Sequence, residues 1–382
     1  MSRGNITRRG KNSWRLKFDV SRHADGRRET RYVTVKGKRQ DAQRELTRLL
    51  AQADTGTLPE PSRMTVEECI TGWLDGAHGL APKTAERYRQ LAEQQIYPHL
   101  GAIRLQKLKP AKVQEWHGSL IKSGGKDGKP LSAQTVTHAH RVLHRALERG
   151  VENETLARNV ASIVSPPKVE KEEIEILSAE EVAATLGKLQ GHDLYSIAAV
   201  ALATGMRRGE LLAARWSDCA LDGAACVRVA RSLEETKAGL RFKPPKSKRS
   251  RRTISLPPNA VGVLCEHRRK QLEKRLALGL GRPHPETLIF CNLEGSPMSP
   301  DDLSRDWARA CKSLGLPKVT FHALRHTHVS ALIAAGLDVI AISRRIGHSS
   351  PTVTLNTYGH LFLNTDAAAA NAIEAAMMRT TR

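Results

Sequence analysis

The stretch ATGMRRGELLAARWSD, residues 203–218, places two arginines beside a glycine that interrupts an apolar helix. Residues 195–216 are otherwise nearly continuously apolar, so we predict a buried helix that breaks at Gly205. A guanidinium at the end of such a helix is costly unless an anion or a carboxylate meets it. Glu210 follows Arg207 by three residues and is placed to hold that side chain. A purely structural Arg–Glu pair is the alternative interpretation.

A second unusual segment is TKAGLRFKPPKSKRSRR, residues 236–252, which holds eight basic residues and no acidic one. Like charges repel one another in the absence of a partner. Contact with phosphate groups is therefore favoured over a merely solvated surface.

The segment HALRHTH, residues 322–328, places His322 and Arg325 on one face of a predicted helix, with His326 one turn after His322. A zinc site would use His322 and His326 as its ligands. We disfavour zinc because the adjacent glutamate and a third ligand are missing from the pattern.

The segment IGHSSPTVTLNTYGH, residues 346–360, holds His348 and, ten residues later, Tyr358. A phenol is a weak nucleophile at its usual pKa of about 10, but neighbouring cations favour the phenolate. Arginines preorganised around a phosphodiester can stabilise its transition state without a metal ion, and a lysine on a flexible turn can protonate the leaving oxygen. These residue types therefore suit metal-free attack by Tyr358 on a phosphodiester, and a buried core tyrosine is the alternative.

The composition points to a polyanionic partner. The 382 residues include 61 Lys and Arg against 39 Asp and Glu, which gives a formal net charge of +22. Nucleic acid is the expected polyanion, because no amphipathic membrane anchor is evident at either end. No apolar run of membrane-spanning length or signal-peptide pattern is present, and the six cysteines form no CxxC pair. We expect a bacterial cytoplasmic protein with reduced thiols.

Residues 1–57 predict a small basic module. The segments 13–20 and 30–35 alternate apolar and polar residues as strands do, and Asp25-Gly26 predicts the turn between them. Residues 39–56 then follow a helical period. A small basic sheet with one helix suits a DNA-reading module, because a sheet can enter the major groove. A solvated basic surface is the alternative.

Residues 64–163 predict an independent all-α domain of four helices, beginning with a capping box at Thr65 and Glu68. His138, His140 and His144 lie in the last of these helices, and no carboxylate or cysteine completes a metal site there. We expect these histidines to be polar groups that face phosphates.

Residues 176–382 predict a larger α+β domain, in which a small antiparallel sheet lies among helices. Ser178 and Glu181 form a second capping-box pattern at its start. Three short strands are expected over 225–233, 239–245 and 251–257, and the remainder of the domain is expected to be mostly helical.

The four motifs resemble those of the tyrosine recombinase family, and in particular its phage and mobile-element integrases. The motifs are ATGMRRGELLAARWSD, PKSKRSRRTI, HALRH and IGHSSPTVTLNTYGH, and they occur in this order in the C-terminal part of the chain. The resemblance extends over the whole chain. It implies an arm-type DNA-binding module at 1–57, a SAM-like core-binding domain at 64–163 and a catalytic domain at 176–382. One departure is Ile346, where a leucine commonly precedes Gly-His.

The resemblance also implies a role for each matched residue. Tyr358 is the nucleophile, Glu210 is the supporting acid, and the groups expected around the phosphate are Arg207, Lys246, His322, Arg325 and His348. Lys246 is the expected general acid, and Lys248 is the competing choice because the hairpin is rich in lysine.

The implied reaction is cleavage and rejoining of double-stranded DNA at attachment sites through a 3′-phosphotyrosyl bond, with no metal or other cofactor. A homotetramer would exchange strands through a Holliday junction, and an excisionase and a host DNA-bending protein are further family expectations. The helix-forming tail after Tyr358 would dock on a neighbouring protomer, with self-packing as the alternative. An inactive DNA-binding regulator and a type IB topoisomerase are the alternative functions. The intact residue set disfavours the regulator, and the second DNA contact of the N-terminal module disfavours the topoisomerase.

Overall fold

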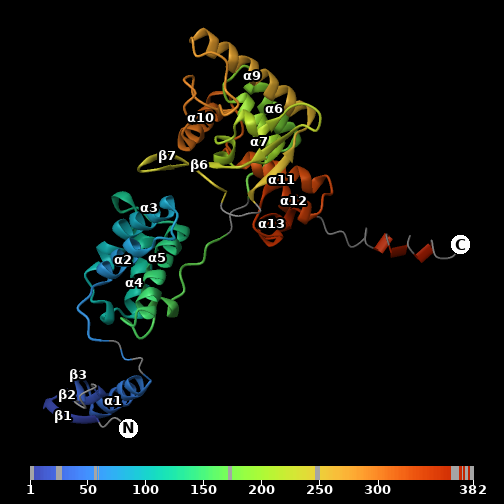
Figure 1. Ribbon diagram of the computed structural model, residues 1–382. Helices are drawn as coiled ribbons and strands as arrows, with labels where there is room; N and C mark the ends of the chain where they lie inside the picture. Colours follow the sequence, from blue (N-terminus) through green and yellow to red (C-terminus); the bar gives the residue numbers. More distant parts are fainter. Residues whose placement is uncertain are drawn as a thin grey trace. The chain divides into compact units, whose positions relative to one another are not determined.

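The computed structural model describes residues 4–22, 28–55, 58, 60–170, 174–245 and 250–362, together with 370, 371, 373, 374, 377 and 378. The chain divides into two compact units, Met1–Lys171 and Glu172–Arg382. Figure 1 labels their helices and strands. Each unit is built around hydrophobic cores of its own.

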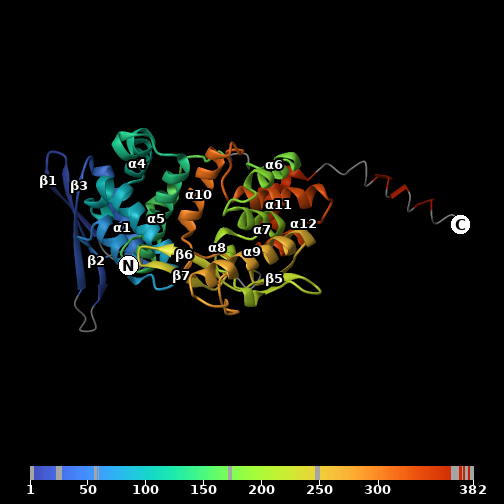
Figure 2. The same cartoon turned by 90° about the horizontal axis from the view of Figure 1, so that it is seen from above.

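The N-terminal module is a three-stranded antiparallel sheet with one helix against it, seen from above in Figure 2. Its elements in chain order are β1 (Gly4–Gly10), β2 (Ser13–Arg22), β3 (Arg28–Lys36) and α1 (Arg39–Asp54). The two predicted strands and the helix are confirmed, and the predicted Asp25-Gly26 turn lies outside the described residues. The strand β1 was not predicted because its polar sequence GNITRRG lacks apolar alternation.

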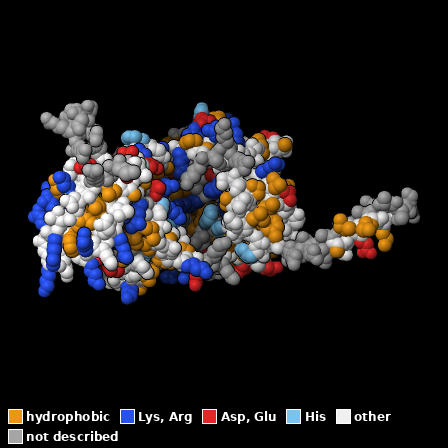
Figure 3. Space-filling model, turned by 90° about the horizontal axis from the view of Figure 1, so that it is seen from below, with side chains coloured by type: hydrophobic (Ala, Val, Ile, Leu, Met, Phe, Trp, Pro, Cys, Tyr) orange, Lys and Arg blue, Asp and Glu red, His pale blue; other side chains and the backbone are white. Residues whose placement is uncertain are grey.

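Leu16 and Phe18 of β2 pack against Ala42, Leu46 and Leu49 of α1 to form a small core. Lys17, between these two residues on β2, points away from this core and is exposed. Figure 3 shows Lys and Arg side chains spread over the outside of this module.

The second part of this unit is all-helical. Its elements are α2 (Val66–Gly76), α3 (Pro82–Leu91), a π-helical continuation (Ala92–Gly101), α4 (Pro110–Ser123) and α5 (Ala133–Glu152). The capping box at Thr65 and Glu68 forms as predicted, with the Glu68 amide 3.2 Å from Thr65 Oγ1. The backbone amide of Thr65 in turn donates to Oε2 of Glu68 at 2.8 Å, so two backbone amides at the start of the helix find acceptors.

One prediction for this region is wrong. His140 does not face outward toward phosphates: it is buried, and its Nδ1 lies 3.1 Å from Nε2 of His117 on α4. Burial and the neighbouring His117 lower the pKa of His140 to about 4, so the ring is neutral at neutral pH. The reason is its position on α5, between the buried residues Ala139 and Val142, on the side of the helix that packs into the domain.

The second unit combines helices with two small antiparallel sheets. Its helices are α6 (Ala179–Leu189), α7 (Tyr195–Thr204), α8 (Arg208–Leu211), α9 (Pro258–Ala277), α10 (Pro300–Ser313), α11 (Ala323–Ala334), α12 (Val339–Ile346) and α13 (Pro351–Tyr358). Its strands are β4 (Cys219–Ala220), β5 (Cys226–Val229), β6 (Ser232–Thr236), β7 (Gly239–Lys243) and β8 (Arg252–Ser255). This mixture of helices and small antiparallel sheets is the predicted fold class.

The strand expected over 225–233 is in fact divided between two sheets. Its first half is β5, which pairs with β4 and β8, and its end begins β6, which pairs with β7 as a hairpin.

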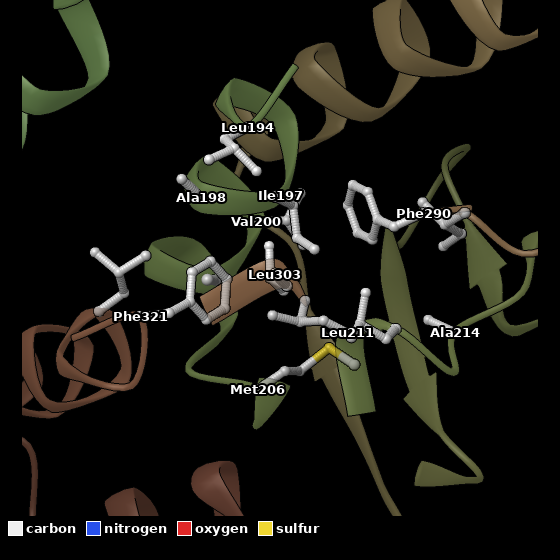
Figure 4. Packing of buried hydrophobic residues seen from close by; sticks show 14 of the residues in the cluster. Leu194, Ile197, Ala198, Val200, Met206, Leu211, Ala214, Phe290, Leu303 and Phe321 are labelled. Carbon is white, nitrogen blue, oxygen red and sulfur yellow. The ribbon is translucent and has the colours of Figure 1, made fainter. Parts of the chain in front are cut away.

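The apolar helix α7 lies in the centre of this unit and contacts both α9 and α11. Ile197 and Val200 of α7 point into a core that also receives Leu211, Phe290 and Phe321 from other elements, as Figure 4 shows. This core holds α7 against its neighbours, and Leu324 near the start of α11 also belongs to it. A smaller core between α11, α12 and α13 contains Val329, Ile342, Ile346 and Tyr358.

In the described part of the chain, no helix combines the length and apolar character that a membrane span needs. The tail after Tyr358 is described only in part. Its described residues from 370 to 378 are helical, with Ile373 and Met377 exposed, and Leu363 lies outside the described residues.

Candidate active site

The break at Gly205 positions the first part of the site. Gly205 ends α7 with φ of 63°, in the left-handed region that favours glycine. A Cβ atom here would lie 2.5 Å from Cδ2 of His328, so a side chain would also clash with α11. The chain turns at this glycine, and Arg207 becomes the residue that precedes α8.

Arg207 is held in place and is still partly exposed. Its Nη1 donates to Oε1 of Glu210 at 2.9 Å, its backbone amide donates to Oε2 at 2.9 Å, and its Nη2 donates to the carbonyl of Gly347 at 3.0 Å. The Arg207 side chain is 38% exposed, whereas that of Glu210 is 3% exposed. Arg208 instead bonds to Ser304 and Asp301 of α10. The guanidinium of Arg207 can therefore meet an anion from solvent.

Arg252 is a member of this network that the sequence analysis did not identify. Its Nη2 and Nη1 donate to the two oxygens of Glu210 at 2.9 and 3.2 Å, and its Nε donates to the carbonyl of Arg345 at 2.7 Å. A signal was available, because alternation along β8 puts Arg252 on the same face as the buried Ile254. Burial alone would raise the pKa of Glu210, but its hydrogen bonds and the charges of Arg252 and Arg207 outweigh burial and lower it.

Arg325 on α11 is fully inside the protein. Its Nη1 donates to the carbonyl of Gly205 at 2.5 Å, and its Nη2 donates to the carbonyl of Ile346 at 2.7 Å. Burial, together with the positive charge of Arg207, lowers the pKa of Arg325 to about 9, which leaves it protonated at neutral pH. Arg207 and Arg325 thus bind the adjacent carbonyls of Gly347 and Ile346, which brings the two guanidinium groups side by side.

His348 follows these two carbonyls directly. Its Nδ1 lies 2.9 Å from Oγ1 of Thr354, a fully buried residue of α13. Burial lowers the pKa of His348 to about 4, and the nearby charges of Arg325 and Arg207 act in the same direction. The imidazole is therefore neutral, and its Nδ1 is engaged by Thr354.

Tyr358 is the last residue of α13 and is 1% exposed. Its hydroxyl oxygen lies 2.7 Å from Nδ1 of His326. Burial raises the pKa of Tyr358 to about 12, while the charges of Arg325 and Arg207 pull it downward. The hydroxyl is protonated at neutral pH and lies within the electrostatic reach of both arginines.

His322 is the N-cap residue that precedes α11, beside this group. Its ring meets that of His326 edge to face, with 4.8 Å between the ring centroids, and its outer side is exposed. Partial burial and the charges of His326 and Arg325 lower the pKa of His322 to about 4. The hydrogen bond of Tyr358 to His326 was not expected, although the helical spacing of His326 one turn after His322 was noted.

The structure therefore brings five of the expected site residues close to Tyr358. They are linked to one another by hydrogen bonds or act on one another's pKa through their charges. They are Arg207, Glu210, His322, Arg325 and His348. Lys246 and its competitor Lys248 lie outside the described residues. Among the residues that the structure describes, no three His, Cys, Asp or Glu side chains are grouped to hold a metal ion.

Known proteins with similar sequences are integrases and tyrosine recombinases. Residues 169–364 match the Phage integrase family, and residues 65–121 match the Phage integrase, N-terminal SAM-like domain. An integrase of Streptomyces ambofaciens is 29% identical over 83% of this chain and 82% of its own length. A XerC-like tyrosine recombinase of Caldanaerobacter subterraneus is 25% identical over 94% of each chain.

The fold is also that of a solved integrase. The structure of the Tn1549 transposon integrase, in complex with transposon right end DNA, has a TM-score of 0.69 and 23% sequence identity. The likeness covers 82% of this chain and 100% of the integrase chain. The family match spans more than half of the sequence and includes all four motifs, so the chain belongs to the phage integrase family.

Proposed function

We propose that this site cleaves and rejoins DNA through a covalent bond between Tyr358 and a 3′-phosphate. As a member of the phage integrase family, the chain is a site-specific recombinase of phage or mobile-element DNA. The proposal concerns how its own residues perform that reaction. The observation that supports it most strongly is the pair of guanidiniums on the adjacent carbonyls of Ile346 and Gly347, beside His348.

Arg207 and Arg325 are proposed to hold the scissile phosphate. A guanidinium is always charged and offers a planar fork of N–H donors to two phosphate oxygens. Both side chains are fixed before substrate arrives, through Glu210 for Arg207 and through Gly205 for Arg325. Charge that needs no reorganisation stabilises a transition state most effectively.

His348 and His322 act as neutral hydrogen-bonding groups at neutral pH. His348 presents Nε2 because Thr354 occupies its Nδ1, and His322 exposes one side of its ring. We assign both to the non-bridging oxygens of the phosphate. Lys246, on the segment between β7 and β8, is the proposed donor of the proton that the departing 5′-oxygen requires.

The reaction conserves bond energy. The oxygen of Tyr358 forms a bond to phosphorus as the bond from phosphorus to the 5′-oxygen breaks, and the reverse attack by a 5′-hydroxyl restores DNA. Recombination of two duplexes breaks four strands, and each strand needs one tyrosine, so we propose that four protomers act together. Residues 1–57 are proposed to bind arm-type DNA sites and residues 64–163 core sites, with excisionase and a host bending protein as accessory partners.

A nicked half-site duplex tests this proposal. Cleavage releases a short strand that carries the 5′-hydroxyl, and this strand diffuses away. The covalent complex therefore accumulates and is measured as an SDS-resistant adduct. We expect adduct formation in EDTA without ATP, and we expect Tyr358→Phe to abolish it while DNA binding stays intact. An adduct that persists in Tyr358→Phe would place the nucleophile at another residue.

A further inference from the structure

The hydroxyl of Tyr358 has a histidine partner that none of the roles above uses. Nδ1 of His326 lies 2.7 Å from the hydroxyl oxygen, and the two ring centroids are 5.6 Å apart. His326 lies on α11 and Tyr358 ends α13, so the contact joins two helices that are separated by α12 in the chain. Tyr358 is 1% exposed and His326 is half-buried, so the contact lies largely inside the protein.

Titratable and charged groups lie around His326 on its own helix and on neighbouring elements. On its own helix these groups are His322 and Arg325, and from neighbouring elements they are His348 and Tyr358 itself. The contacting helix α7 has no charged residue, and His360 after α13 is exposed. Burial lowers the pKa of His326, and the charge of Arg325 acts in the same direction. A neutral ring has one nitrogen that can accept, and the protonated phenol of Tyr358 can donate to it.

We propose that His326 accepts the proton of Tyr358 as the tyrosine attacks phosphorus. This inference rests on the proposed role of Tyr358 as the nucleophile. In the forward step the bond from the tyrosine oxygen to phosphorus forms, and the phenolic proton passes to Nδ1 of His326. The 5′-oxygen departs with a proton from the general acid. In the rejoining step the imidazolium returns its proton to the departing phenolate.

The other two histidines of the site make different contacts. His348 directs Nδ1 to Thr354, and His322 meets the ring of His326. Bulk water has little access to a phenol that is 1% exposed. The acceptor is therefore a protein group already in contact with the hydroxyl. His326 touches the reacting atom, which makes it a catalytic residue under this proposal.

Two substitutions separate proton transfer from positioning. His326→Asn keeps an oxygen near the place of Nδ1, which can accept a hydrogen bond but cannot take the proton. His326→Phe removes both abilities and keeps a ring. His360→Asn is the matched control, because it makes the same change at an exposed histidine two residues after Tyr358. Each full-length variant is assayed in single-turnover cleavage of the half-site duplex from pH 6 to pH 9.5, and its DNA affinity and melting temperature are measured alongside.

We expect His326→Asn and His326→Phe to cleave roughly 10²–10³-fold more slowly than the unaltered protein at pH 7.5, within the range of general-base catalysis. The deficit should shrink as pH rises, because a larger fraction of the phenol is then already ionised and needs no acceptor. His360→Asn should match the unaltered protein. His326→Asn cleaving within threefold of the unaltered protein across the pH range would overturn the inference, because a positioning role alone would then suffice.

A modified substrate provides an independent readout. A 5′-bridging sulfur leaves without a proton, so it should restore cleavage to variants that lack the general acid but not to the His326 variants. Full restoration in His326→Asn would assign His326 to the leaving group and refute the proposal. Different results refute the proposed function and the inference about His326. Absence of any adduct with the unaltered protein refutes the proposed function, whereas normal cleavage by both His326 variants refutes only this inference.

Discussion

The buried carboxylate of Glu210 should be one of the most sensitive positions for the stability of the second unit. It is 3% exposed, and it accepts hydrogen bonds from the backbone and side chain of Arg207 and from two nitrogens of Arg252. Arg252 is itself only 6% exposed. Removing the carboxylate would leave a buried guanidinium without a counter-charge.

Breaking a buried ion pair by deleting one partner costs about 3–5 kcal/mol. For a unit of this size, about 2–4 °C of melting temperature is lost per kcal/mol, so Glu210→Ala should lower the melting temperature by roughly 6–20 °C. Glu210→Gln should lose less, because its amide oxygen still accepts one of these hydrogen bonds. Scanning calorimetry of the full chain measures both values.

The control is Glu266→Ala, which removes a carboxylate that is 46% exposed and paired with Arg269 on the surface of α9. Exposed pairs contribute little to stability, so this variant should melt like the unaltered protein. If Glu210→Ala melts within a degree of Glu266→Ala, the network around Glu210 does not stabilise the fold and the reasoning is refuted.

The lowered pKa of Glu210 also predicts how its contribution to the stability of the fold changes with pH. The pKa of Glu210 is lower in the folded protein than its ordinary value, so its contribution is fully present above the ordinary pKa of about 4.3. That contribution should be lost as pH falls through the lowered value. The difference in melting temperature between the unaltered protein and Glu210→Gln should therefore narrow below pH 4, and a constant difference would contradict the assignment.

Three further predictions concern the helix break and the groups proposed to surround the phosphate. Arg325→Lys should reduce adduct formation at least ~10²-fold with little change in DNA affinity, because the single nitrogen of an ammonium cannot replace the planar set of donors that reaches the carbonyls of Gly205 and Ile346 and still faces a phosphate. Thr354→Val should slow cleavage by about tenfold, because Nδ1 of His348 loses its partner, and single-turnover rates check this result. Gly205→Ala should destabilise the fold by about 1–2 kcal/mol for its left-handed backbone alone, and by more for the clash with α11, as a lowered melting temperature would report.

Local features of the site could be predicted from the sequence. The helix break, the Arg207–Glu210 pair and the capping boxes at Thr65 and Ser178 each depend on residues only a few positions apart. Short spacing on a helix determines which side chains meet, whatever the rest of the fold does. These predictions are confirmed for that reason.

Long-range partners could not be predicted in the same way. Arg252 reaches Glu210 across 42 positions, and His326 reaches Tyr358 across 32. Helical spacing shows that His322 and His326 share a face, but the packing of α13 on α11 decides which of them meets the tyrosine. Likewise, the burial of His140 depends on how α5 packs on its neighbours, and a polar residue type alone favours the wrong side.

Identifying the amino acid that is bonded to DNA tests most directly whether Tyr358 is the nucleophile. The trapped adduct is digested with nuclease and trypsin, and the modified peptide is sequenced by mass spectrometry. We predict a nucleotide linked through its 3′-phosphate to Tyr358, within the tryptic peptide that begins at Ile346. A nucleotide on any other residue, or a linkage through a 5′-phosphate, would contradict the mechanism.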